Sequence, residues 1–279
     1  RSYLYVPGDR AQVLAKAPTR GADALIVDLE DAVPLAAKEA ARSTVAAWLA
    51  GLEGEDRRPE VWVRVNNHPD LLARDLEAVG SSPALAGVVI PKVDGPEVLE
   101  EVDRILPDGV AIQVMVETAR GVLVLPRLAK APRVLRLQLG EADLSADLGM
   151  TLSVDGAELA PVRLEVVIAS AAAGLERPVA PVSTDYRDLA SFEASTLALR
   201  RLGFGARAAI HPAQVAVINR AFTPSDDEVM QARELLDRAE GAAAAGTGVF
   251  LDSAGRMVDE AVLRAARQTL ALAEQERRR

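Results

Sequence analysis

The sequence predicts an α/β protein built as a (β/α)8 TIM barrel with a C-terminal helical extension. Eight short apolar runs alternate with amphipathic stretches along most of the 279 residues, the pattern of a parallel sheet covered by helices. Hydrophobic residues make up 49% of the chain, enough for a large core. The first strand-to-helix turn reads VPGDRAQ and lacks the G-x-G-x-x-G fingerprint of a doubly wound sheet, so the barrel is favoured over that alternative.

The expected strands follow one another at spacings that leave room for a helix after each of them. The helical stretch at Glu97 to Leu106, for example, places its apolar side chains on one face. In a barrel of this kind the active site lies at the C-terminal ends of the strands. The strands are predicted at Tyr3 to Val6, Ala24 to Asp28, Val61 to Val65, Gly87 to Ile90, Ala111 to Val116, Val134 to Leu139, Pro178 to Pro181 and Ala206 to Ile210.

Two further helical segments follow the eighth unit. We therefore expect a barrel with a catalytic bowl over residues 1–222 and a helical extension over residues 223–279. The first segment begins near Ser225, which has capping-box spacing to Glu228. An appendage of this kind is able to swing over the barrel mouth or to pack on a neighbouring subunit.

The composition argues against several classes of function. The chain has no cysteine, so it forms neither disulfides nor thiolate metal sites. Its net charge of −9 argues against a nucleic-acid-binding surface, which requires a basic stripe. No apolar run approaches the roughly 20 residues needed to span a bilayer. We expect a cytoplasmic protein that has neither a nucleic-acid partner nor a membrane partner.

Polar side chains stand at the predicted ends of five strands, where a barrel would direct them into one bowl. Any one of them could simply cap a helix or form a structural ion pair. Five in register are harder to explain in that way. They occur in VDLEDAVP (Asp28, Glu30 and Asp31), VWVRVNN (Arg64), VIPKVD (Lys92), VMVETARG (Glu117) and GEADLSADLG (Asp143).

Glu117 and Asp143 follow adjacent strands and could share one divalent cation. Mg²⁺ prefers oxygen ligands and usually keeps positions for water and for substrate oxygens. Two carboxylates neutralise the ion, so a chelating anionic substrate would complete the site. Arg64 would then supply the positive charge that such a substrate needs.

The residues after Glu117 open a predicted helix. The free N–H groups of Thr118 and Ala119 could hold a substrate carboxylate there, and Gly121 would allow a close approach. The alternative is an ordinary strand-to-helix turn, with Arg120 as a structural ion-pair partner of the VDLED segment.

Two basic residues suggest further roles. Arg10 in PGDR, with Lys16 after it, could contact the phosphates of coenzyme A, although a surface position for Arg10 explains it as well. Lys92 raises a rival chemistry, because a Schiff-base aldolase places its nucleophilic lysine at a barrel strand end. Against that reading, the carboxylate pair would then have no purpose.

Taken together, these motifs resemble the citrate lyase β-subunit-like branch of the HpcH/HpaI aldolase and citrate lyase superfamily over nearly the whole chain. Each motif alone is weak, but their order is specific. The segments that carry the resemblance are LYVPGDR, ALIVDLEDAVP, VRVN, VIPKVD, VETARGVL, GEADLSADLG, LGFGARAAIHPAQVAVINRAFTPS and GRMVDEAVL.

The resemblance implies a Mg²⁺-binding barrel that assembles into homotrimers or hexamers. Such proteins cleave or form a carbon–carbon bond in a citryl, malyl or citramalyl thioester, carried by coenzyme A or an acyl carrier protein. The products are a 2-oxo acid and an acetyl thioester. The metal ligands would be Glu117 and Asp143, and Arg64 would bind substrate. Asp259 in MVDEAVL matches an acidic residue that related lyases supply from the adjacent subunit.

In the mechanism that these residues suggest, Arg64 stabilises the thioester enolate, Asp259 moves the proton at its carbon, and Glu30 and Asp31 orient metal-bound water or an arginine. One motif departs from the family's usual GAED or GGED. The order GEAD keeps Asp143 in place but moves a carboxylate to Glu141, which puts metal tuning and substrate preference in doubt.

Three functions stay open at this point. The first is the Mg²⁺-dependent carbon–carbon lyase. The second is a malyl-type thioesterase, which the same metal site could serve by activating water. The third is a subunit of a citrate lyase complex that requires carrier-bound substrate.

Overall fold

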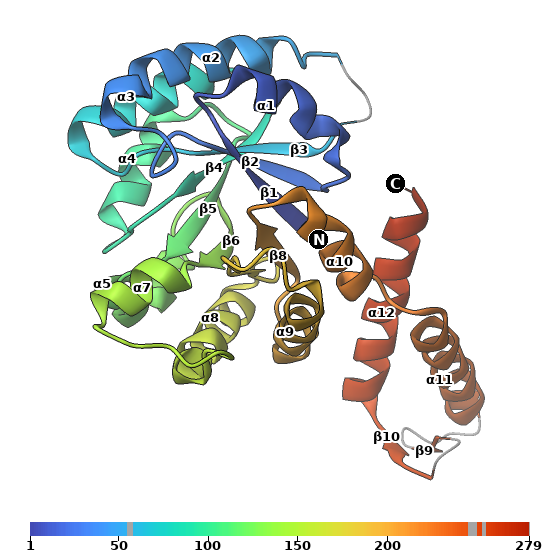
Figure 1. Ribbon diagram of the computed structural model, residues 1–279. Coiled ribbons are helices and arrows are strands. Elements are labelled where there is room, and N and C mark those ends of the chain that lie inside the picture. Colours follow the sequence, from blue (N-terminus) through green and yellow to red (C-terminus); the bar gives the residue numbers. More distant parts are fainter. Residues whose placement is uncertain (55–57, 245–249, 253–254, 279) are drawn as a thin grey trace. The chain divides into compact units, whose positions relative to one another are not determined.

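The computed structural model describes residues 1–54, 58–244, 250–252 and 255–278 (Figure 1). These residues form two compact units, Arg1–Arg220 and Ala221–Arg279, and each is described by itself. In the described part of the chain, no helix has both the length and the apolar character needed to cross a membrane.

The first unit is a closed barrel in which eight parallel strands pair in chain order. The predicted (β/α)8 fold is therefore confirmed. The strand bounds lie within about two residues of the predicted ones. They are β1 (Ser2–Pro7), β2 (Ala24–Asp28), β3 (Glu60–Arg64), β4 (Leu85–Ile90), β5 (Ala111–Val116), β6 (Val134–Leu139), β7 (Val179–Ala180) and β8 (Ala206–Ala209).

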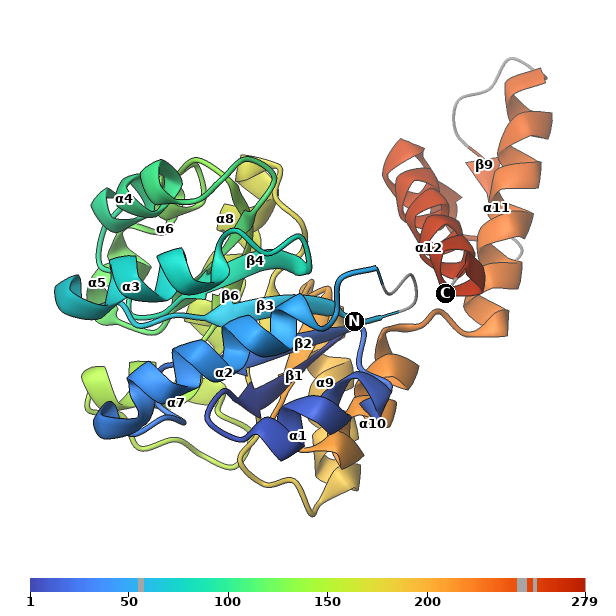
Figure 2. The same cartoon turned by 90° about the horizontal axis from the view of Figure 1, so that it is seen from above.

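The helices of this unit lie outside the ring of strands (Figures 1 and 2). Three short 3-10 helices, at Ala17–Arg20, Leu35–Ala37 and Ala157–Leu159, accompany them. The helices are α1 (Ala11–Lys16), α2 (Lys38–Ala50), α3 (Pro69–Val79), α4 (Glu97–Ile105), α5 (Ala119–Leu123), α6 (Leu125–Leu128), α7 (Glu141–Asp147), α8 (Ala160–Ala173), α9 (Leu189–Leu202) and α10 (Pro212–Phe222).

The barrel interior is filled by alternate side chains of the strands, because successive residues of a strand point to opposite faces. Tyr3, Trp62 and Met115 belong to this core, and the rings of Tyr3 and Trp62 lie 6.4 Å apart. Strand register carries the alternation to the strand ends: Asp28 of β2 pairs with Arg64 of β3. The register therefore brings these two polar side chains together at the C-terminal mouth of the barrel.

Strand β7 is the shortest strand of the barrel. It has two residues, pairs with β6 only at Gln138 and Val179, and pairs with β8 at two positions. The barrel is consequently held by far fewer backbone hydrogen bonds at β7 than between β1 and β5.

The second unit consists of α11 (Asp226–Ala244), a two-stranded antiparallel sheet of β9 (Phe250–Leu251) and β10 (Met257–Val258), and α12 (Glu260–Arg278). The predicted capping box is confirmed. The Glu228 carboxylate accepts from the Ser225 backbone N–H at 2.8 Å, and the Ser225 hydroxyl accepts from the Glu228 N–H at 3.1 Å.

Candidate active site

Arg64 is the centre of an ion-pair network at the C-terminal ends of β2 and β3. Its Nε and Nη2 donate to the two carboxylate oxygens of Asp28 at 2.8 and 2.6 Å, and Nη1 lies 3.0 Å from Glu30 Oε2. The guanidinium also lies over the ring of Tyr5, 5.1 Å from its centroid. Burial lowers the pKa of Arg64, but the bonds to Asp28 and nearby negative charges outweigh it and raise the pKa above its usual range. Arg64 is therefore a fixed cation with two of its five N–H groups still uncommitted.

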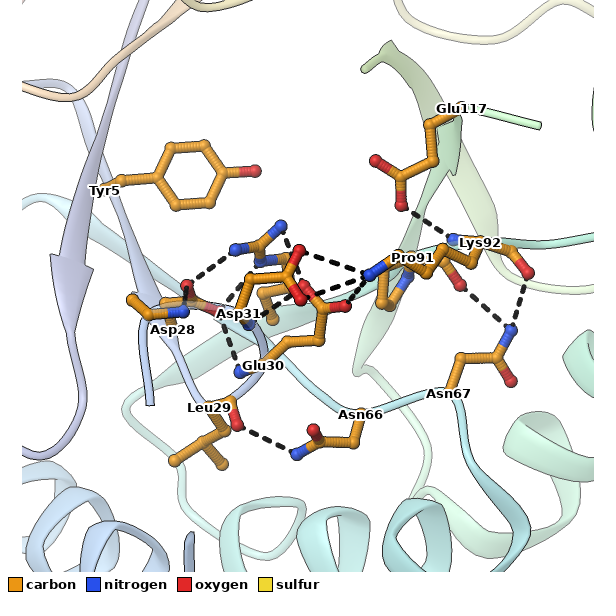
Figure 3. A network of polar contacts seen from close by, with 12 residues as sticks. Tyr5, Asp28, Leu29, Glu30, Asp31, Asn66, Asn67, Pro91, Lys92 and Glu117 are labelled. Atoms are coloured by element: carbon orange, nitrogen blue, oxygen red, sulfur yellow. Dashed lines mark hydrogen bonds and ion pairs between the residues drawn. The ribbon is translucent and has the colours of Figure 1, made fainter. Parts of the chain in front are cut away.

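Lys92 joins the same network from the end of β4 (Figure 3). Its Nζ contacts Glu30 and lies 3.2 Å from both carboxylate oxygens of Asp31. Partial burial lowers the pKa of Lys92, but the bonds to Glu30 and Asp31 outweigh it and raise the pKa. A protonated amine is not a nucleophile, so these contacts disfavour the Schiff-base alternative.

The pKa values of Glu30 and Asp31 shift in opposite directions in this network. Burial raises the pKa of Glu30, with the nearby Asp31 adding to the rise. For Asp31, which is exposed, the hydrogen bonds from Glu30 and Lys92 outweigh burial and lower the pKa. Arg120, the other arginine considered as a partner, is exposed and forms no ion pair with a described residue. Glu30 and Asp31 thus orient Arg64 and Lys92.

Glu117 lies buried directly after β5. Its Oε1 accepts from the backbone N–H of Lys92 at 2.8 Å, while no described residue donates to its Oε2. Burial raises the pKa of Glu117 to about 8, and the charges of Asp143 and Glu30 add to the rise. A carboxylate that is buried beside other carboxylates, with one oxygen free, is suited to a cation.

Asp143 and Glu117 line one cavity of about 130 Å³ at the mouth of the barrel. Tyr5, Arg64 and Gln138 also line it, together with apolar groups such as Val182 and Ile210. No described residue donates a hydrogen bond to the Asp143 side chain. Among residues 1–54, 58–244, 250–252 and 255–278, no three His, Asp or Glu side chains are placed to hold a metal. The two carboxylates fit one Mg²⁺ that takes its remaining ligands from water and substrate.

The helix start after Glu117 is arranged differently from the simplest expectation. Thr118 caps α5, because its hydroxyl accepts from the Gly121 N–H at 3.0 Å and donates to Asp94 at 2.7 Å. The Ala119 N–H donates to the Asp147 carboxylate at 2.7 Å. A substrate carboxylate at this position would therefore have to replace Asp147.

A second helix start faces the cavity at α7. Its first turn contains Ala142 and Asp143, whose backbone N–H groups have no acceptor among the described residues. Glu141, the carboxylate that distinguishes the GEAD motif, pairs with an arginine instead of lining the proposed metal position. Its two oxygens accept from Nε and Nη2 of Arg163 on α8, at 2.6 and 2.9 Å.

Two further site residues were expected from the sequence, Arg10 and Asp259. Arg10 is exposed, and its side chain forms no hydrogen bond or ion pair with a described residue. Asp259 belongs to the second unit, where its Oδ1 accepts from the backbone N–H groups of Ala261 and Val262 at the start of α12. Both assignments stay predictions.

Several residues that line or support the site could not be predicted from sequence motifs. Tyr5 faces inward because it stands two residues after Tyr3 on β1. Gln113 and Gln138 are polar residues within apolar strands, which is itself a signal of a specific buried contact. Lys38 anchors the loop after β2 by donating to the carbonyl oxygens of Leu29 and Glu30 at 2.8 and 2.9 Å.

Comparison with known proteins adds to this geometry. Residues 1–212 match the family model described as HpcH/HpaI aldolase/citrate lyase. A citrate lyase subunit beta-like protein of Deinococcus radiodurans is 35% identical over 97% of this chain and 96% of its own length. A (3S)-malyl-CoA thioesterase of Cereibacter sphaeroides is also 35% identical, over 98% of this chain and 94% of its own.

Among solved structures, the protein CitE of Mycobacterium tuberculosis superimposes with a TM-score of 0.81. It is 29% identical, and the match covers 98% of this chain and 97% of that one. That structure is a complex with magnesium, acetoacetate and coenzyme A.

Proposed function

The chain belongs to the HpcH/HpaI aldolase/citrate lyase family, and from the geometry of its bowl we propose that it is a Mg²⁺-dependent carbon–carbon lyase. Its substrate would be a β-hydroxyacyl thioester such as citryl-, malyl- or citramalyl-CoA. The products would be acetyl thioester and oxaloacetate, glyoxylate or pyruvate. The observation that carries the proposal is that the buried Glu117 and the half-buried Asp143 line one cavity with the cationic Arg64.

Glu117 and Asp143 would hold the metal. Glu117 offers Oε2, since its Oε1 is held by Lys92, and Asp143 has no competing donor. A bound Mg²⁺ supplies Lewis-acid polarisation of the substrate oxygens. The magnesium complex of the Mycobacterium tuberculosis relative supports this choice of ion.

Arg64 would stabilise the negative charge that develops when the carbon–carbon bond breaks. The hydroxyl of the substrate would lose its proton to solvent water and become the carbonyl of the 2-oxo acid, while the electron pair of the broken carbon–carbon bond goes to the thioester half, which leaves as an enolate. Two N–H groups of Arg64 stay free of Asp28 and Glu30 and can donate to the enolate oxygen. Asp28 and Glu30 keep the guanidinium in place for this.

The remaining assignments complete the proposal. Asp259 would deliver a proton to the enolate carbon, from the C-terminal segment of a neighbouring subunit in a homotrimer or hexamer. Thr118 and Ala119 would bind the carboxylate of the 2-oxo acid once it replaces Asp147. Arg10 would contact the coenzyme A phosphates, and the coenzyme A of the Mycobacterium tuberculosis complex supports such a ligand. A cytoplasmic location stays a prediction from the sequence.

The experiment that tests the lyase proposal follows both products at once. Purified protein is given citryl-, malyl- and citramalyl-CoA with Mg²⁺ or with EDTA, and 2-oxo acid and free thiol are measured separately. We expect 2-oxo acid only with Mg²⁺. Free thiol without 2-oxo acid would indicate a thioesterase, the second candidate, which the 35% identity to a malyl-CoA thioesterase favours. No product from any ester would point to a subunit that needs carrier-bound substrate.

A matched pair of variants tests the assembly. Chains carrying Glu117→Gln and chains carrying Asp259→Asn would each be inactive alone. If Asp259 acts across an interface, co-expression of the two should restore part of the activity, because mixed oligomers contain sites with both intact residues. No recovery in verified mixed oligomers would place Asp259 in its own subunit's site or outside the mechanism.

A further inference from the structure

A chain of three polar side chains crosses the barrel interior beneath the proposed metal site. Gln113 of β5 donates from Nε2 to Gln138 Oε1 of β6 at 2.5 Å, and Gln138 Nε2 donates to the Tyr5 hydroxyl oxygen of β1 at 3.0 Å. Both amides are buried, with 0% and 2% of their surface exposed. A buried polar group costs free energy unless it is hydrogen-bonded, so a chain of this kind is specific rather than incidental.

The direction of these hydrogen bonds, from donor to acceptor, follows from which buried atoms each direction would leave unpaired. In the observed direction, the one unsatisfied amide atom is the Gln113 Oε1 acceptor. The reverse direction, with Tyr5 donating to Gln138 and Gln138 to Gln113, would instead bury the Gln113 NH2 group with two unpaired donors. The observed direction is therefore favoured, in which Gln138 donates to the Tyr5 hydroxyl oxygen.

Tyr5 must then donate its own proton elsewhere. Tyr5 lines the cavity with Glu117 and Arg64, and its hydroxyl points toward the side of Glu117 (Figure 3). Burial raises the pKa of Tyr5 above its usual range, against the lowering effects of Arg64 and Gln138. The hydroxyl therefore stays protonated and acts as a donor, and it is not a base.

We propose that Tyr5 is a substrate-binding residue whose hydroxyl donates to an oxygen of the 2-oxo acid, and that Gln138, held by Gln113, is a positioning residue that aims this proton into the cavity. The inference rests on the proposed function and deepens it. The cavity of about 130 Å³ is lined by the two proposed metal ligands as well as by Tyr5, which favours a 2-oxo acid that lies beside the metal and within reach of Tyr5. Tyr5 then selects for a ligand that presents an oxygen to the barrel floor, since a ligand without one would leave the hydroxyl unpaired.

The test is the condensation reaction, in which the KM values for acetyl-CoA and for the 2-oxo acid are measured separately with Mg²⁺. Glyoxylate, pyruvate and oxaloacetate are used in turn. Tyr5→Phe should raise the KM for the preferred 2-oxo acid about tenfold to a hundredfold, the size of a lost hydrogen bond to a charged ligand. The KM for acetyl-CoA should stay unchanged.

Tyr3→Phe is the matched control, because Tyr3 also points into the barrel from β1 but does not line the cavity. It should leave both KM values within about twofold of the wild type. Gln138→Met should also raise the KM for the 2-oxo acid, and the double variant with Tyr5→Phe should be no worse than Tyr5→Phe alone if Gln138 acts through Tyr5. Equal KM values in Tyr5→Phe and wild type, or equal losses in Tyr5→Phe and Tyr3→Phe, would overturn the assignment.

Calorimetric titration of the same 2-oxo acids into the protein with Mg²⁺ separates this inference from the lyase proposal. If the wild type binds a 2-oxo acid but forms no carbon–carbon bond, the lyase proposal fails. The role of Tyr5 is then decided by whether Tyr5→Phe loses that binding. If the wild type binds none of the three acids, both proposals fail.

Discussion

The backbone N–H of Lys92 donates to Oε1 of Glu117 at 2.8 Å, so the end of β4 holds one carboxylate oxygen at the end of β5. The other oxygen faces Gly140, where a Cβ atom would lie only 2.5 Å from it. A residue larger than glycine would therefore displace the Glu117 carboxylate from its observed position. The geometry of the proposed metal site thus depends on the backbone at Lys92 and at Gly140, which follow the strands β4 and β6 on either side of β5.

Metal affinity should rise with pH, because Mg²⁺ binds the ionised carboxylate of Glu117. Its pKa is raised to about 8 in the metal-free protein, so below this pH the metal must displace a proton. We expect affinity to increase up to about tenfold per pH unit from pH 6 to 8 and then to level off. Calorimetric titrations in two buffers of different ionisation enthalpy should show proton release at pH 7.

The same shift has the opposite sign for the stability of the metal-free protein. The folded pKa of Glu117 lies above its ordinary value of 4.5, so the contribution of Glu117 to stability is greatest below pH 4.5 and is lost as pH rises toward 8. Glu117→Gln is the control, because its side chain cannot ionise and the variant should lack this pH dependence of stability.

For the metal, an affinity independent of pH between 6 and 8 would contradict the assignment of Glu117 as a ligand.

Arg64→Ala should lower stability as well as activity. The change leaves Asp28 and Glu30 buried without their shared cation, a loss of about 3–5 kcal/mol by analogy with other broken buried pairs. Urea unfolding at neutral pH measures it. The double variant with Asp28→Asn should recover part of the stability without recovering activity. Recovery of both would show that Arg64 has a structural role only.

Borohydride treatment with pyruvate or glyoxylate should trap no covalent adduct on Lys92. Its amine is held protonated by Glu30 and Asp31, which opposes attack on a carbonyl. Mass spectrometry of the peptide that contains Lys92 checks this, with a known Schiff-base aldolase treated in parallel as a positive control. A reduced adduct on Lys92 would revive the metal-independent mechanism.

Asp147→Ala should strengthen binding of the 2-oxo acid, because it removes the carboxylate that occupies the Ala119 N–H. The gain should be about a few-fold, the scale of one exposed charge-assisted hydrogen bond. The affinity for Mg²⁺ should not change. Unchanged or weaker binding of the acid would direct its carboxylate to the free N–H groups at the start of α7 instead.

Glu141→Gln tests whether the carboxylate of the GEAD motif still influences the metal. Both of its oxygens pair with Arg163, so we expect lower thermal stability and a loss of Mg²⁺ affinity smaller than tenfold. Thermal unfolding and Mg²⁺ titration of the same preparation measure the two effects. A tenfold to hundredfold loss of affinity at unchanged stability would show that Glu141 tunes the metal after all.

The local sequence pattern was sufficient to predict the fold and to identify candidate residues at the C-terminal mouth of the barrel. Short apolar runs located strands such as β5 and β6 to the residue, and the polar residues that follow these runs identified Glu117 and Asp143 as candidates. The pairing among these residues was beyond local pattern, because it depends on strand register and side-chain direction. Arg64 with Asp28, Lys92 with Glu30 and Ala119 with Asp147 each join segments at least 28 residues apart. Tyr5 and its glutamines escaped notice because a strand interior is expected to be apolar.

The ion-pair network at the barrel mouth has a practical consequence for altering this protein. Ion pairs join the charged residues at the ends of β2, β3 and β4, so substitutions there would disturb several partners at once. Val182 and Ile210, which follow β7 and β8, line the same cavity with apolar side chains and no such cross-links. A library intended to change which acid the proposed site accepts would therefore begin at these two positions, because substitutions there leave the ion-pair network of Arg64, Lys92, Asp28 and Glu30 untouched.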